Sequence, residues 1–247
     1  MALTSYQHSA QYTYIDEALR AQWEAFSALE TEIAGFVPRP TEEFRPRRDA
    51  EVERMRLLNP DKTIEDLSAF VDKQFEFTTS PQWQFHARFE RRHMTQYVTV
   101  IMLAHALSEA LVNAVLAIGL ANAGAQELFP LLERSEFRQK WLYGPKCFTP
   151  GYKCPIGTAL NETLTMLARQ RNALVHLKIE LTVDGSKLLE GTDFERKRFD
   201  EERAWLRRYF SLPYDLAEFV RKSIKEPMLM LLFDRKPIEI AAAHVGA

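Results

Sequence analysis

The 247-residue chain is 46% hydrophobic and 27% charged, and it contains only 9 glycines. This apolar share excludes an intrinsically disordered chain, and the shortage of glycine together with many helix-forming residues favours an all-α fold over a turn-rich β fold. A formal net charge of −2 gives no overall attraction to nucleic acid, so any RNA contact must depend on local basic patches.

The first third of the chain predicts helices separated by prolines. An amphipathic pattern covers residues 15–36, and two prolines then end that helix. A charged helix is expected over 46–59 and an amphipathic one over 63–77. Because these elements carry no motif, residues 1–80 are interpreted as an N-terminal helical extension.

The second third begins with a long helix, predicted over 83–123. Within it His105, Glu109 and Asn113 recur every four residues. Polar groups at this spacing form an internal stripe in a helical bundle, whereas they are costly in the middle of a membrane span. We therefore interpret the segment as a core helix and expect no membrane association. Another helix is predicted over 126–142.

The segment over 143–157 combines prolines and glycines with both cysteines, which indicates a loop. Cys147 and Cys154 could pair or bind a metal, but no neighbouring Cys or His completes a four-ligand zinc set. Residues 1–11 lack the apolar core of a signal peptide. We therefore expect a cytoplasmic chain with two free thiols and with neither a metal nor another cofactor.

The final third contains the helix that draws attention, predicted over 158–176. Its apolar residues follow the spacing of one buried helical face, at Leu160, Leu164, Leu167, Leu174 and Leu177. A short β-hairpin and a plain loop are both compatible with 179–189. Two helices are expected over 192–210 and 213–233, with a break at Pro213 and a kink at Pro227. Residues 81–235 thus predict a helical bundle, and residues 236–247 a tail.

Residues 171–176 read RNALVH, which places an arginine five positions before a histidine. On a regular helix Asn172 and His176 share a face, whereas Arg171 and His176 point about 140° apart. One regular helix therefore does not direct both side chains well at one small ligand, so either the arginine reaches around with its long stem or a second copy of the helix supplies the missing half. A two-fold dimer supplies the second copy, because an isologous interface brings the same patch from both subunits together.

These residue types suit the cleavage of RNA. Histidine moves protons near neutral pH, and the guanidinium of arginine matches a phosphate and its transition-state charge. Since RNA carries its own nucleophile in the 2′-hydroxyl, one acid–base group and one charge clamp could suffice without a metal.

The hexamer resembles the R-x4–6-H motif of the HEPN superfamily, including a polar residue after the arginine. Leu167 before the motif, Lys178 after it, the upstream Glu109 and Asn113, and the sequence FRQKW at 137–141 agree with this resemblance. The similarity covers roughly residues 91–233.

The resemblance implies an all-α bundle that dimerises through the motif helices. Many members are metal-independent endoribonucleases of toxin, phage-defence or RNA-processing systems. By position, Arg171 would clamp the phosphate, His176 would be the general acid or base, and Asn172 would contact the substrate or orient the histidine. Glu109 would position Arg171 or His176. An antitoxin or another regulatory protein is then a candidate partner.

Other interpretations stay open. Other members of the superfamily are non-catalytic, so an RNA- or protein-binding module is the alternative, and a small-molecule sensor using a pocket beside the 143–157 loop is a third hypothesis. His105 and Glu109 could bind a metal or form a buried polar pair. Arg88, Arg91 and Arg92 are interleaved with aromatic residues. They could clamp single-stranded RNA, or the segment could simply have one solvated basic face and one aromatic core face. Lys178 is a further candidate RNA contact.

Overall fold

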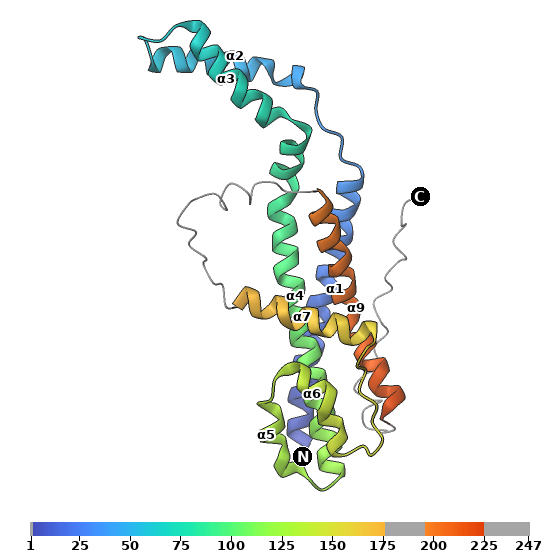
Figure 1. Cartoon of the computed structure of the whole chain (residues 1–247). Helices are drawn as coiled ribbons and strands as arrows, with labels where there is room; N and C mark the ends of the chain where they lie inside the picture. Colours follow the sequence, from blue (N-terminus) through green and yellow to red (C-terminus); the bar gives the residue numbers. More distant parts are fainter. Residues whose placement is uncertain (1, 176–195, 225–247) are drawn as a thin grey trace. The chain divides into compact units, whose positions relative to one another are not determined.

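The computed structural model describes residues 2–175 and 196–224, and within these ranges it contains helices and no strand (Figure 1). In chain order the elements are α1 (Ala2–Ala34), η1 (Thr41–Phe44), α2 (Arg45–Leu58), α3 (Ile64–Thr79), α4 (Pro81–Asn122), η2 (Gln126–Leu128), α5 (Phe129–Glu133), α6 (Phe137–Tyr143), η3 (Gly144–Cys147), α7 (Ala159–Val175) and α9 (Arg196–Ser223). The all-α prediction is therefore confirmed for the described residues. The expected hairpin, the Pro227 kink and the tail lie outside them.

The chain groups into two units. The smaller unit is Phe26–Thr95, and the larger unit combines Met1–Ala25 with Gln96–Ala247. Both α1 and α4 contribute residues to each unit. The domain boundaries predicted at residues 80 and 235 therefore stay predictions, and each unit is described by itself.

In the smaller unit, α2 and α3 form a helical hairpin. The Thr63 hydroxyl caps α3 by accepting a hydrogen bond from a backbone N–H of the first turn. Leu67 and Val71 are the buried apolar residues of α3. Arg48 on α2 links the two helices, since its guanidinium donates hydrogen bonds of 2.7 and 2.9 Å to the carboxylate of Asp72.

The core of the larger unit is built around the C-terminal part of α4. Its buried apolar side chains are Val100, Ile101, Ala104, Leu107, Leu111, Val112, Val115, Leu116 and Leu120. The contacts that join α1 to α9 include the rings of Trp23 and Phe210, which meet edge to face at 4.8 Å, and the buried Asp16, which accepts a hydrogen bond from the Tyr214 hydroxyl. The guanidinium of Arg20 on α1 also lies over the ring of Tyr214 on α9.

By length and composition α4 could also cross a membrane. Half of its most apolar window is buried against protein, and core helices of soluble proteins pass the same test. The cytoplasmic location therefore stays a prediction.

The single helix predicted over 126–142 is wrong, because the segment forms η2, α5 and α6 instead. The chain leaves helical geometry at Glu136, whose φ and ψ are −55° and 137°. The break turns α6 so that Phe137 and Trp141 are buried, while Leu131 of α5 stays exposed. The segment therefore forms a short helix with one buried face, α6, instead of one continuous longer helix.

The break predicted at Pro213 is also wrong, since α9 runs through it. Proline removes the N–H that would bond to the carbonyl of Tyr209, and in a helix interior this costs about 3 kcal/mol. Phe210, Tyr214 and Leu216 around it are all buried. Burying such side chains contributes about 1.5–3 kcal/mol each, which offsets the lost hydrogen bond.

The 143–157 segment packs on α4. The ring of Phe148 lies directly over Gly119, where a Cβ atom would be 2.2 Å from the ring. A pocket of about 340 Å³ lies beside this contact and is lined by residues of α4, by Phe148 to Pro150 and by Ile224. Both cysteines are free thiols.

Candidate functional site

The site is organised around α7, the helix that carries the RNALVH sequence. The Thr158 hydroxyl accepts a hydrogen bond from the backbone N–H of Asn161 and so starts the helix. Leu164 and Leu167 are fully buried, so the first half of α7 packs against the rest of the larger unit. Its second half is more exposed, and the described part of the chain ends at Val175. His176 and Lys178 therefore lie outside the described residues.

Arg171 is partly exposed on this second half. One of its guanidinium nitrogens, Nη1, donates a hydrogen bond of 3.2 Å to the side-chain oxygen of Asn172. No carboxylate within 2–175 or 196–224 forms an ion pair with Arg171. Asn172 thus contacts the arginine, and within the described part of the chain the rest of the guanidinium fork has no carboxylate partner.

The predicted polar stripe of α4 meets a residue that sequence reasoning missed. The Lys140 ammonium on α6 donates hydrogen bonds of 2.8 Å to Glu109 and 3.1 Å to Asn113. The lysine side chain is only 2% exposed, whereas that of Glu109 is 36% exposed. One signal could have found it: Lys140 lies three residues after Phe137, so the two share a helical face, and Phe137 is buried.

His105 completes this cluster one turn before Glu109. Its Nδ1 lies 3.8 Å from the second carboxylate oxygen of Glu109, and its ring stacks on Phe137 with centroids 4.2 Å apart. Burial lowers the pKa of His105, the charge of Glu109 opposes this, and the positive charges of Arg171 and Lys140 lower the pKa further. The imidazole is therefore neutral at pH 7, and Arg171 lies near enough to act on it.

The polar cluster thus draws on two helices, with His105, Glu109 and Asn113 from α4 and Lys140 from α6, and the charge of Arg171 on α7 acts on His105 from outside it. Among the described residues, no three His, Cys, Asp or Glu side chains come together as a metal site. His105 and Glu109 are instead accompanied by the two cations. Arg171 has no carboxylate partner among residues 2–175 and 196–224, and a guanidinium of this kind is suited to binding an anion.

The arginines suggested as RNA contacts belong to the smaller unit and already have neighbours. Arg92 donates hydrogen bonds of 2.7 and 2.9 Å to Glu32, which lowers the pKa of that carboxyl. Arg88 lies over the rings of Phe36 and Phe89. Arg91 is exposed. Among the aromatic residues here, Phe89 is fully buried in the core of the unit, whereas Trp83 is 40% exposed.

No protein-family model, no curated protein and no solved structure matches this chain. The assignment of a function therefore depends on α7 and the residues around it.

Proposed function

We propose that the chain is a HEPN-like, metal-independent endoribonuclease that works as a dimer. The observation that carries the proposal is the state of Arg171: its guanidinium is partly exposed and has no carboxylate partner among the described residues. An arginine without a carboxylate partner among the described residues favours binding of a negatively charged group such as a phosphodiester.

In the proposed reaction, the 2′-oxygen of a ribose attacks the adjacent phosphorus. The imidazole of His176 transfers a proton, either from that hydroxyl or to the 5′-oxygen that leaves. The bond between phosphorus and the 5′-oxygen breaks, which yields a 2′,3′-cyclic phosphate and a free 5′-hydroxyl. Arg171 donates hydrogen bonds to the non-bridging oxygens, whose negative charge grows in the transition state.

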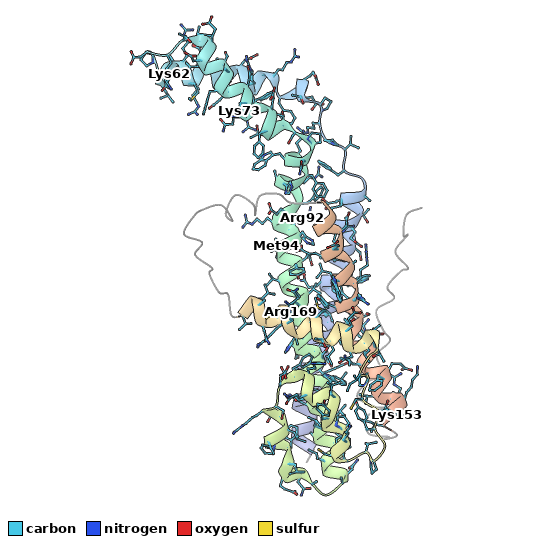
Figure 2. The ribbon with its side chains drawn as sticks, in the orientation of Figure 1. Lys62, Lys73, Arg92, Met94, Lys153 and Arg169 are labelled. Atoms are coloured by element: carbon cyan, nitrogen blue, oxygen red, sulfur yellow. The ribbon has the colours of Figure 1, made fainter. Side chains whose placement is uncertain are left out.

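The test is cleavage of a labelled RNA by the full-length protein in EDTA. We expect wild-type protein to cut the RNA and to leave a DNA strand of the same sequence intact. His176→Ala and Arg171→Ala should each reduce the rate by at least about 100-fold. Arg169→Ala is the matched control, since Arg169 is an exposed arginine of the same helix (Figure 2). Cleavage that survives His176→Ala would contradict the proposal.

A second candidate is a non-catalytic module that binds RNA or a protein. It is favoured by the α2–α3 hairpin of the smaller unit, where Phe70 and Phe77 are each 60% exposed and Leu57 is 76% exposed. Large exposed apolar side chains that gather on one element are typical of interaction sites. Equal retention of RNA by wild type and His176→Ala, with cleavage by neither, would support this module instead.

A further inference from the structure

A small pocket lies in the smaller unit between α2 and α3. It has a volume of about 200 Å³, and its lining combines Phe44 of η1 and Phe75 of α3 with mainly polar side chains. Pockets for drug-sized ligands have volumes of about 300–1,000 Å³, so this one has room for a single small group such as one ring. Its lining residues all belong to 44–79, a range that the structure describes.

The charged side chains that line the pocket are only partly paired. Arg48 donates hydrogen bonds of 2.7 and 2.9 Å to Asp72, and Glu51 accepts hydrogen bonds of 2.6 and 2.8 Å from Arg54. Arg47 is exposed, and its charge reaches Glu51 without a hydrogen bond to any described residue. The pocket therefore carries one guanidinium that no carboxylate of the described residues binds, which suits a phosphate group.

A second polar side chain of the lining belongs to Gln74 on α3. Gln74 is exposed, and its amide forms no hydrogen bond with the residues of 2–175 and 196–224. An amide has a donor and an acceptor side by side, a pattern that pairs with the edge of a nucleobase. The rings of Phe44 and Phe75 provide surfaces on which a base can stack. An apolar side chain of a protein partner would instead cover these polar groups without pairing them, which is unfavourable.

We propose that this pocket binds one nucleobase of single-stranded RNA. The base stacks against the aromatic lining, its edge pairs with the Gln74 amide, and the adjacent phosphate accepts hydrogen bonds from Arg47. The inference rests on the proposed function for the choice of RNA as the ligand. It adds a site in the smaller unit that holds the strand without cutting it.

The probe is a fluorescent single-stranded 2′-O-methyl RNA oligonucleotide, which lacks the nucleophile and stays uncut. Anisotropy titration of the full-length protein should show binding about 10-fold weaker for Arg47→Ala, as expected for one lost charge-assisted contact. The slope of log affinity against log salt should become less steep by about 0.7, the value for one phosphate contact on a single strand. Arg45→Ala is the matched control. Arg45 is also exposed, it does not line the pocket, and it points about 160° away from Arg47 on a regular helix.

Gln74→Met keeps the length of the side chain and removes its amide. We expect binding about 5-fold weaker with an unchanged salt slope, because a neutral hydrogen bond is lost. With an abasic oligonucleotide, Arg47→Ala should still weaken binding, whereas Gln74→Met should have no effect, since no base is left to pair. A Gln74→Met loss that is the same for both probes would overturn the proposal. Both substitutions are at exposed positions, where changes usually leave the fold intact.

The outcomes separate this inference from the proposed function. If wild type cuts unmodified RNA but both variants bind the oligonucleotide as well as wild type does, the proposed function stands and this site is wrong. The pocket is then left to a protein side chain. If wild type cuts no RNA but binds the oligonucleotide through Arg47 and Gln74, the nuclease proposal fails and the base pocket stands. A wild type that binds no oligonucleotide overturns the base pocket.

Discussion

At the scale of single residues, two buried tyrosines differ in the charge of the group that accepts the hydrogen bond from their hydroxyl. Tyr214 donates to the carboxylate of the buried Asp16 at 2.5 Å, and burial, followed by this hydrogen bond, raises the pKa of Tyr214. Tyr152 donates to the neutral backbone carbonyl of Trp141 at 2.8 Å. Hydrogen bonds to charged groups contribute more than neutral ones.

We therefore expect Tyr214→Phe to lower the free energy of unfolding by about 1.5–3 kcal/mol, because it leaves a buried carboxylate one donor short. Tyr152→Phe is the matched control and should lower it by only about 1 kcal/mol. Urea unfolding of the two variants beside wild type measures both. Equal losses would show that the charge on Asp16 adds nothing to the bond.

Residue identities in the site were only partly predictable from the sequence. The four-residue spacing of His105, Glu109 and Asn113 predicted one polar stripe, and the structure gathers all three around one cluster. Lys140 was quoted only within the FRQKW segment and missed as a site residue, because lysine is almost never fully buried. Its partners lie about 30 positions earlier in the chain, a distance that helical periodicity cannot bridge.

At the scale of elements, periodicity predicted the helices whose faces are continuous, such as α4 and α7. It failed where tertiary packing outweighs local preference. The 126–142 segment breaks so that Phe137 and Trp141 are buried, and α9 continues through Pro213 because the residues on both sides of it are in the core. Both outcomes depend on how these side chains pack against other elements, which the local pattern could not predict.

The contact between α4 and the 143–157 segment gives a prediction for an element interface. Gly119→Ala should lower the free energy of unfolding by about 1–3 kcal/mol, although alanine is otherwise favoured over glycine inside a helix by about 1 kcal/mol. The reason is the ring of Phe148, which lies 2.2 Å from where the new Cβ would be placed. Thermal or urea unfolding measures the change.

Two controls separate this clash from other effects. Gly35→Ala should be nearly neutral, since the nearest atom to its added Cβ lies 3.6 Å away. In the Phe148→Ala background the ring is gone, so Gly119→Ala should become neutral or stabilising there. The same loss in both backgrounds would mean that something other than the ring limits this position.

At the scale of the whole molecule, the geometry of α7 bears on how many copies of the chain form one site. Side chains five positions apart point about 140° away from each other on a regular helix. Arg171 lies on the exposed half of α7, so the histidine that shares its phosphate is expected from a second copy. The proposed dimer therefore places Arg171 of one subunit beside His176 of the other.

This arrangement predicts that two inactive variants restore each other. In a heterodimer of Arg171→Ala and His176→Ala, one of the two shared sites keeps both its arginine and its histidine, and the other keeps neither. We expect heterodimers isolated through two different affinity tags to cut RNA at about half the wild-type rate, while each variant alone stays inactive. Heterodimers of Arg171→Ala with the Arg171→Ala/His176→Ala variant contain no complete site and serve as the control. If the first heterodimer forms and remains as inactive as this control, each site takes both residues from one chain, and the predicted sharing between subunits is wrong.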